Sequence, residues 1–281
     1  ILDGVDRTFT HEGITYQTNS FGIRNKEISS PKDSTIFRIL CLGDSYTWGA
    51  GLNEDQLITV KLETLLNAWG KKDFQVINAG IPGTNTQDQY EQLVRLHPIY
   101  KPNHIIQFFF TNDLIATNDS NQIADWKINT ITWLRQNSRF YSFVYYLIKS
   151  SFNKEVAVPQ FLLPNDYFNL DDSKPGWVAF KNYFTKIKLF TQEKEIGYTF
   201  VMIPTLTNLD ENYPYQELRT KVYAFAKSQQ IPVLDFFDHF AIHNPLDLWV
   251  SKQNTHWNDF ATTIAADTLS KFLLNNDLLN Y

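Results

Sequence analysis

The chain has 281 residues, of which 43% are hydrophobic, so it can bury a large core and is not disordered as a whole. Its formal net charge is -5 and its longest basic run is Lys71-Lys72, which argues against a nucleic-acid partner because phosphate binding needs clustered Lys and Arg. The single cysteine, Cys41, cannot form an internal disulfide and lies in an apolar run, where we expect a buried strand.

Residues 1–34 are expected to form an arm or hairpin packed on the rest of the chain. This stretch combines Gly4, Gly13 and Gly22 with the alternating apolar residues Ile14 and Tyr16. No apolar run in the sequence reaches the roughly 18 residues that span a bilayer. The sequence starts at Ile1 rather than Met, which is consistent with a removed leader or anchor, so export from the cytoplasm is an expectation.

Strands and helices are predicted to alternate along most of the chain. Short apolar runs rich in β-branched and aromatic residues predict five buried strands: Ile36–Leu42, Phe74–Asn78, His104–Phe110, Tyr198–Ile203 and Pro232–Leu234. Helix-length segments lie between and after them: Asp55–Ala68, Asn85–Leu96, Lys181–Glu195, Tyr215–Gln229 and Asp259–Asn275. This alternation predicts a parallel sheet with helices on both faces, an α/β domain over residues 35–281.

One segment is too long for a simple crossover between strands. Residues 114–176 separate the third and fourth predicted strands and are rich in aromatic side chains: Trp126, Trp133, Phe140, Tyr141, Phe143, Tyr145 and Tyr146. These rings need either a core or an apolar ligand. We therefore predict an insertion that forms an aromatic cover beside the site, with an accessory layer on the sheet edge as the alternative.

Four polar blocks fall where a ligand of an open parallel sheet is expected, beyond the carboxyl ends of the strands. In chain order they are Gly43-Asp44-Ser45-Tyr46-Thr47, Asn78-Ala79-Gly80-Ile81-Pro82-Gly83-Thr84, Thr111-Asn112-Asp113 and Asn254-Thr255-His256-Trp257-Asn258. Taken singly, each block has a structural interpretation as a helix cap, a glycine loop or a packed histidine. Their joint occurrence in this order favours a catalytic site.

These blocks, with GDS in LCLGDSYTWGAG, NAGIPGTNT and FFFTNDL, resemble the SGNH hydrolase superfamily of GDSL esterases and lipases, over roughly Ile36 to the C-terminus. The resemblance implies a three-layer α/β/α sandwich with a flavodoxin-like, five-stranded parallel sheet. It also implies that Ser45 is the nucleophile and His256 the general base, with Gly83 and Asn112 as oxyanion donors. The stretch YQTNSFGIRN is similar to an arm found in a subset of these proteins that often sit behind an exported N-terminus.

The chemistry of these residue types agrees with those roles. A serine hydroxyl is a weak nucleophile unless an imidazole removes its proton during attack. The resulting oxyanion is stabilised by preorganised donors, and removing one costs about 3 kcal/mol in comparable enzymes. The sequence Gly43-Asp44-Ser45-Tyr46-Thr47 is not a Gly-x-Ser-x-Gly elbow, which disfavours an α/β-hydrolase fold. We expect an ester of a small molecule, glycan or lipid as substrate, and no cofactor.

Two positions depart from the family pattern. Thr111 stands where a Gly usually precedes the Asn, which is tolerable if its side chain faces away from the site. The Asp that normally lies two or three residues before the His is replaced by Asn254 and Gln253. An Asn carbonyl can orient an imidazole but cannot stabilise its positive charge as a carboxylate does. Asn254 is therefore the expected orienting residue, and Asp235 is a less favoured carboxylate that more simply fixes a turn.

Three further interpretations stay open. If water is the acyl acceptor, the protein is an esterase. If a sugar hydroxyl takes part, it is an O-acyltransferase or a deacetylase that acts on a glycan. The missing carboxylate also allows a catalytically impaired domain that binds carbohydrate or lipid. His239 and His243 are four residues apart and could share a helix face as metal ligands, but no third ligand follows at a diagnostic spacing, so no metal is expected.

Overall fold

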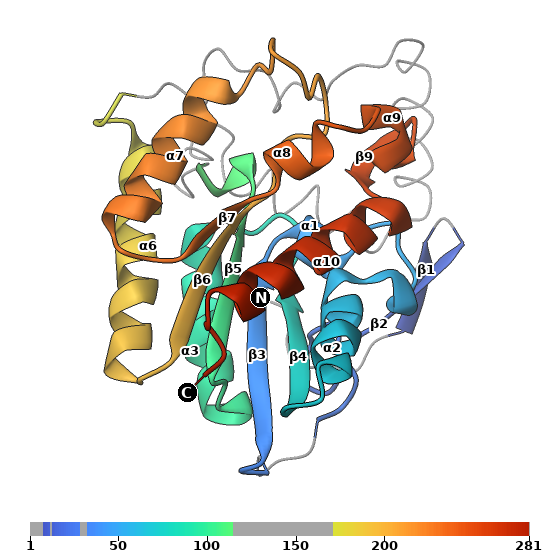
Figure 1. Ribbon diagram of the computed structural model, residues 1–281, viewed down its shortest axis with the longest axis vertical. Helices are drawn as coiled ribbons and strands as arrows, with labels where there is room; N and C mark the ends of the chain where they lie inside the picture. The colour runs from blue at the N-terminus through green and yellow to red at the C-terminus, as the bar shows by residue number, and fades with distance from the viewer. Residues whose placement is uncertain (1–7, 12, 29–32, 115–170, 281) are drawn as a thin grey trace, which may run out of the picture.

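The computed structural model describes residues 8–11, 13–28, 33–114 and 171–280. Its centre is a five-stranded parallel sheet in the order β4-β3-β5-β6-β7 (Figure 1). The strands are β3 (Ile36–Gly43), β4 (Asp73–Gly80), β5 (His104–Phe109), β6 (Gly197–Met202) and β7 (Val233–Asp235). All five predicted strands are present within a few residues of the expected bounds, and their order is the flavodoxin-like one.

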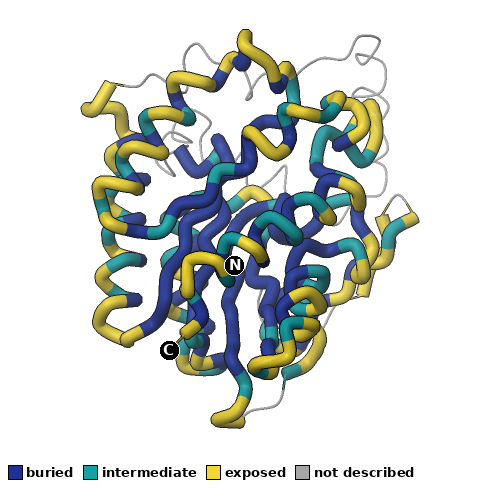
Figure 2. The backbone as a smooth tube through the Cα atoms, in the orientation of Figure 1, coloured by how far each residue is buried: buried dark blue, intermediate teal, exposed yellow. Residues whose placement is uncertain are grey.

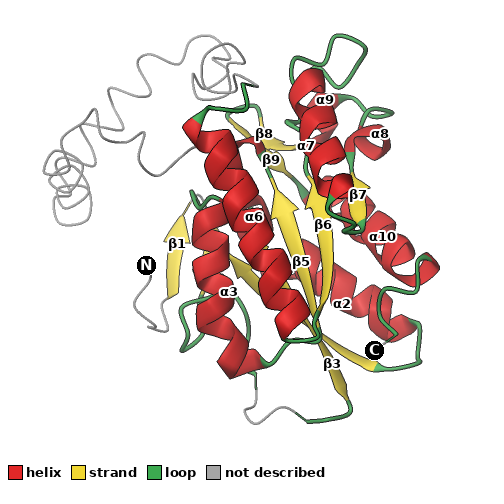
Figure 3. Cartoon of the chain, turned by 90° about the vertical axis from the view of Figure 1, so that its left-hand side faces the viewer, coloured by secondary structure: helices red, strands yellow, loops and turns green. Residues whose placement is uncertain are grey.

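Helices cover both faces of this sheet. The longer ones are α2 (Ile58–Ala68), α3 (Thr86–Tyr100), α6 (Pro175–Glu193), α7 (Gln216–Ser228) and α10 (Asp259–Asn275). Helices α2 and α10 lie together on one face, whereas α3 and α6 lie on the other (Figures 1 and 3). The protein is therefore a three-layer α/β/α sandwich. Within the described residues, no helix is both long and apolar enough to cross a membrane.

Several short elements complete the described chain. They are α1 (Ser45–Trp48), α8 (Phe237–Phe240), α9 (Pro245–Leu248), the 3-10 turns η1 (Glu54–Gln56) and η2 (Thr111–Leu114), and the antiparallel hairpins β1 (Thr8–His11)/β2 (Ile14–Gln17) and β8 (Trp249–Ser251)/β9 (Asn254–Trp257). The β1/β2 hairpin lies in the stretch where an arm or hairpin is expected. The β8/β9 hairpin and the helices α8 and α9 were not predicted.

Three helices differ from their expected bounds for identifiable reasons. The segment expected to be helical from Asp55 is interrupted at Leu57, which is extended with ψ 138° and separates η1 from α2. Helix α6 begins at Pro175, a residue suited to the first helical turn because it has no N–H to satisfy. Helix α3 continues through Pro98 to Tyr100, four residues beyond the expected end at Leu96, and is capped by Lys101 in the left-handed region.

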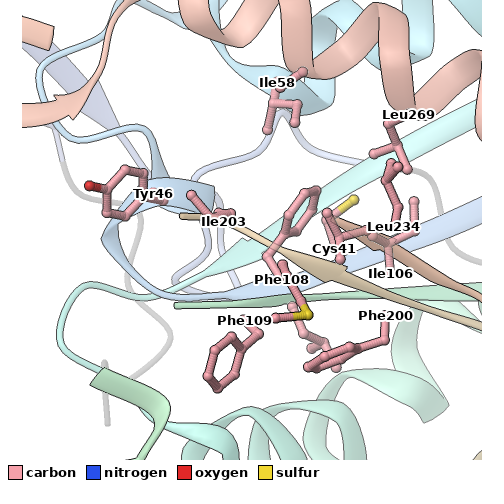
Figure 4. Close-up of a cluster of buried hydrophobic side chains, with 14 of the residues drawn as sticks. Cys41, Tyr46, Ile58, Ile106, Phe108, Phe109, Phe200, Ile203, Leu234 and Leu269 are labelled. Carbon is pink, nitrogen blue, oxygen red and sulfur yellow. The ribbon is translucent and has the colours of Figure 1, made fainter. Parts of the chain in front are cut away.

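The core lies on both faces of the central strands β3 and β5, which are buried along their length except at Ile36, the first residue of β3 (Figure 2). Figure 4 shows part of this cluster: Ile106 and Phe108 of β5 point to the side of the sheet where Leu269 of α10 lies, whereas Phe109 packs against Phe200 on the other side. Cys41 is fully buried in β3, as expected. Burial on both faces explains why the strands read as continuous apolar runs rather than as an alternating pattern.

Strand β4 forms one edge of the sheet, and side chains bind its outward N–H groups. The N–H of Phe74 donates to Asn67 Oδ1 at 2.8 Å, and that of Val76 to Glu63 Oε2 at 2.7 Å. The N–H of Asn78 donates to Oδ1 of Asn25 at 3.1 Å. These three N–H groups are thus satisfied by two residues of α2 and one residue from the N-terminal region.

Candidate active site

Ser45 is the first residue of α1, directly after β3. The Asp44 side chain caps this helix by accepting a hydrogen bond from the Tyr46 N–H at 2.9 Å. Helix α1 packs closely on the ends of β3 and β4: a Cβ at Gly43 would lie 2.0 Å from Thr47 Oγ1, and one at Gly80 would lie 2.4 Å from the Trp48 nitrogen. Both positions therefore require glycine, and together they fix the height of Ser45 above the sheet.

His256 faces Ser45 from strand β9. Its Nε2 lies 2.8 Å from Ser45 Oγ, and its Nδ1 lies 2.7 Å from Asn254 Oδ1. The backbone N–H of His256 also donates to Asn254 Oδ1 at 3.2 Å. Because a backbone N–H can only donate, the oxygen of the Asn254 amide must face the imidazole. The Nδ1–H then donates to Asn254, and Nε2 is left as the acceptor for the Ser45 hydroxyl.

Aromatic contacts hold α1 against β9. The Trp257 indole N–H donates to the Tyr46 carbonyl at 3.0 Å, and the Tyr46 ring lies 4.8 Å from the His256 ring. The Tyr46 hydroxyl donates to the Thr255 carbonyl at 3.4 Å. Burial lowers the pKa of His256 to about 4, so its imidazole is neutral at neutral pH and can accept a proton. Among the described residues no carboxylate contact offsets this effect, since the partner of Nδ1 is the Asn254 amide.

Asn112 lies in η2, just after β5, and is tied to the residue before Ser45. Its Nδ2 donates to Asp44 Oδ2 at 2.7 Å. An amide nitrogen carries two hydrogens, so this bond leaves one available for a substrate. Burial raises the pKa of Asp44 to about 6, although the hydrogen bonds from Tyr46 and Asn112 oppose the shift. The contact between Asp44 and Asn112 was not predicted from the sequence.

Gly83 is exposed in the turn between β4 and α3, with φ +79°, a conformation that favours glycine. The same turn is bound to the end of β3, because the Ile81 N–H donates to the Gly43 carbonyl at 3.0 Å and Thr84 Oγ1 donates to it at 3.2 Å. The polar blocks after β3, β4 and β5 therefore meet at one end of the sheet.

Asp113 connects the second and third polar blocks. Its buried carboxylate accepts hydrogen bonds from Thr86 Oγ1 at 2.9 Å and Gln89 Nε2 at 2.8 Å, both on α3, and from the Phe110 N–H at 2.9 Å. Burial raises the pKa of this carboxyl group well above its ordinary value. No role was predicted for Asp113, whose only signal in the sequence is its position directly after Asn112.

Other candidate residues lie elsewhere. Asp235 is paired with Arg219 and accepts a hydrogen bond from the Phe237 N–H at 2.9 Å, so it fixes a turn, while Asn254 is the partner of His256. Thr111 lines a hollow with Met202 and Arg219 at the ends of β5 and β6.

In the part of the chain that the structure describes, no cluster of three or more His, Cys, Asp or Glu side chains could hold a metal ion. The aromatic insertion, including Trp126 and Trp133, lies almost wholly outside the described residues.

Solved structures with the same fold include several esterases. A two-domain esterase active on acetylated mannans matches with a TM-score of 0.54 and 13% identity, covering 88% of this chain and 50% of that one. A lipase/acylhydrolase from Enterococcus faecalis matches with a TM-score of 0.51 and 15% identity over 85% of this chain and 96% of that one. The esterase EstA from Pseudoalteromonas sp. matches with a TM-score of 0.51 and 15% identity, covering 85% and 97%.

At these identities the structural likeness establishes the fold alone, and membership of a family has to come from the sequence. No curated protein matches the chain. The family model of the GDSL-like lipase/acylhydrolase family matches residues 41–261, a span that holds Ser45, Gly83, Asn112 and His256. Because this match covers most of the chain, the protein belongs to the GDSL-like lipase/acylhydrolase family.

Proposed function

We propose that the protein is a serine-dependent ester hydrolase in which Ser45 forms an acyl intermediate and His256 acts as general base. Membership of the GDSL-like lipase/acylhydrolase family supports ester hydrolysis. The observation that carries the finer assignment is the 2.8 Å contact between Ser45 Oγ and His256 Nε2, with Nδ1 held by Asn254. In the same proposal, residues 35–281 form the hydrolase domain and residues 1–34 form an arm packed on it.

The reaction proceeds in two half-reactions. Ser45 Oγ attacks the ester carbonyl as its proton passes to His256 Nε2, and the tetrahedral intermediate collapses when the same proton is given to the leaving alkoxide. Water then attacks the acyl-Ser45 ester with His256 again as base. A sugar hydroxyl in place of water would make the same intermediate serve acyl transfer.

Three donors would stabilise the oxyanion of both intermediates: the backbone N–H groups of Ser45 and Gly83, and Nδ2 of Asn112. The first lies at the start of α1, and the second lies in a turn that is bound to the end of β3. The third is held in place by its other hydrogen, which binds Asp44 at 2.7 Å. Such donors act mainly in the transition state, because charge develops on the carbonyl oxygen only there.

Asn254 supplies orientation without charge. Its Oδ1 holds the imidazole in the tautomer that the mechanism needs, but an amide stabilises the imidazolium less than a carboxylate does. We therefore expect slow turnover rather than none. The alternative of a catalytically inactive binding domain rests on this missing carboxylate, and the hydrogen-bonded Ser45–His256 pair favours the enzyme.

The test is covalent labelling of the nucleophile. A fluorophosphonate probe should label the wild-type protein at Ser45, as located by peptide mass spectrometry, and Ser45→Ala should lose both labelling and turnover of short-chain p-nitrophenyl esters. Ser228→Ala is the control, since Ser228 is an exposed serine at the end of α7. Labelling at another residue, or full turnover by Ser45→Ala, would contradict the mechanism. A folded wild type that is neither labelled nor active would favour the binding domain.

A further inference from the structure

Arg24, in the N-terminal region, binds the end of α1, the helix that begins with Ser45. Only 4% of Arg24 is exposed, and its guanidinium donates to three carbonyl groups: those of Trp48 at 3.1 Å, Gly49 at 2.6 Å and Leu52 at 2.6 Å. The same guanidinium lies 4.5 Å from the centre of the Tyr16 ring. The chain just after α1 is therefore fixed by a buried cation that makes three hydrogen bonds to it, rather than by a surface contact.

The segment that Arg24 holds is bonded directly to Ser45. The N–H groups of Gly49 and Ala50 both donate to the Ser45 carbonyl, each at 3.0 Å. The peptide group between Gly49 and Ala50 therefore accepts a hydrogen bond from Arg24 through its carbonyl and donates one to the Ser45 carbonyl through its N–H. Any movement of this segment would shift the Ser45 backbone, which carries both the attacking oxygen and a proposed oxyanion N–H.

Tyr16 fixes a second point, beside the histidine. The Gly51 N–H donates to the Tyr16 hydroxyl oxygen at 2.8 Å. Gly51 has φ +84°, and a Cβ there would lie 2.8 Å from Val250 and 3.1 Å from Asn254 Nδ2. The Gly51 backbone is thus packed against both strands of the β8/β9 hairpin. The Tyr16 hydroxyl therefore holds Gly51, and Gly51 packs against Asn254, whose amide orients His256.

We propose that the N-terminal arm is part of the catalytic apparatus, with Arg24 and Tyr16 as positioning residues that hold Ser45 and Asn254 in register. Ser45 lies near the beginning of the domain's sequence and His256 near its end. The arm contacts the segment after α1, which is bonded to Ser45 and packs against Asn254, the partner of His256. This inference rests on the proposed function of Ser45, and it adds that the hydrolase domain without its arm would have a misaligned Ser45–His256 pair. Small misplacements of reacting groups are costly because the chemistry requires near-attack geometry.

The chain offers a matched pair of variants for the test. Tyr16→Phe removes a buried hydroxyl that accepts one hydrogen bond between the N-terminal region and the core. Tyr100→Phe does the same on α3, where the hydroxyl accepts from Asn19 Nδ2 at 3.0 Å. Both substitutions loosen the attachment of the arm, but only the first lies against the segment that supports Ser45 and Asn254.

We expect Tyr16→Phe to lower kcat for a p-nitrophenyl ester about tenfold with KM unchanged, and to slow fluorophosphonate labelling of Ser45 to a similar degree. Tyr100→Phe should keep kcat within about twofold of the wild type, although urea unfolding shows a comparable loss of stability. If kcat falls equally in both variants, or in neither, the arm is a structural attachment only and the positioning role is wrong.

A readout that does not depend on turnover separates this inference from the proposed function. The His256 Nδ1–H bonded to Asn254 should give a downfield proton resonance that exchanges slowly with solvent. Tyr16→Phe should speed its exchange, and Tyr100→Phe should not. Should the wild type hydrolyse no ester, faster exchange in Tyr16→Phe alone would still support positioning, while equal exchange in all three proteins would refute it.

Discussion

The amide of Asn112, at the end of β5, donates a hydrogen bond of 2.7 Å to the carboxylate of Asp44, at the end of β3. The partner of the proposed oxyanion donor is thus the residue that immediately precedes the nucleophile. One side chain caps the helix that begins at Ser45 and also aims the group expected to bind the developing charge. This double role makes Asp44 a sensitive point of the site.

Asp44→Asn should lower kcat about tenfold and Asp44→Ala about a hundredfold, with KM changed little, because the Asn112 amide loses its charged acceptor. Above pH 6, by contrast, the free energy of unfolding of Asp44→Asn should be higher than that of the wild type. A group whose pKa is raised to about 6 by burial contributes stability below its unfolded pKa and loses it as the pH rises through 6, and Asn does not titrate. Steady-state kinetics and urea unfolding at pH 5 and pH 8 check both effects. Parallel losses of kcat and stability at pH 8 would contradict this role.

Asn112→Ala should lower kcat by roughly a hundredfold and leave KM nearly unchanged, since an oxyanion donor acts mainly in the transition state. Asn85→Ala is a useful comparison, because Asn85 caps α3 and its loss should reduce stability rather than kcat. A rise in KM alone for Asn112→Ala would mean that the residue contacts the ground-state substrate.

Asn254→Asp should raise kcat, because a carboxylate beside Nδ1 stabilises the imidazolium that forms during attack. The added anion should also raise the pKa of His256 above its present value of about 4, which burial has lowered, so the acidic limb of the pH–rate profile should move to higher pH. Asn254→Ala should be slower than the wild type, since the imidazole loses its orienting partner. Equal rates in all three proteins would indicate a Ser–His dyad that does not use position 254.

His104→Gln should flatten the loss of stability in acid. His104 is fully buried in β5 against Thr199, and burial lowers its pKa to about 3. Between the ordinary histidine pKa of about 6.5 and pH 3, the unfolded chain binds a proton there that the folded chain does not, so stability falls as the pH falls. Removing one such group should reduce the slope by up to about 1.4 kcal/mol per pH unit. Urea unfolding from pH 7 to pH 4 gives the slope, and identical slopes would show that His104 is protonated in the fold.

Much of the fold follows from the sequence because its strands are buried on both faces, and runs such as Ile36–Leu42 leave little alternative to a parallel sheet. The β8/β9 hairpin could not be predicted in this way. Most residues of its short strands have intermediate exposure, and long-range hydrogen bonds from Trp249 to Leu206 and from Trp257 to Tyr46 hold it in place. Tertiary contacts of this kind have no local signature.

The candidate site, too, could be predicted only in part. Its residue types could be selected from the sequence, because each polar block follows a predicted strand or precedes the last helix. The contacts among them could not: the bond between Asp44 and Asn112 joins residues 68 apart, and that between Ser45 and His256 joins residues 211 apart. Asn254 is the intermediate case, since its spacing of two residues from His256 suggested that its carbonyl orients the imidazole, and the 2.7 Å contact between Nδ1 and Oδ1 has that geometry.

The satisfied edge of strand β4 has a consequence for how copies of this chain can associate. An open edge strand recruits another strand by backbone pairing, which leads to sheet extension and aggregation. Here Asn67, Glu63 and Asn25 already occupy the donors of Phe74, Val76 and Asn78, so this border cannot be lengthened by a second molecule without displacing them. Because Asn25 comes from the N-terminal region, proteolytic loss of that region would free the Asn78 N–H alone, and the two donors bound by α2 would still hinder the addition of a strand.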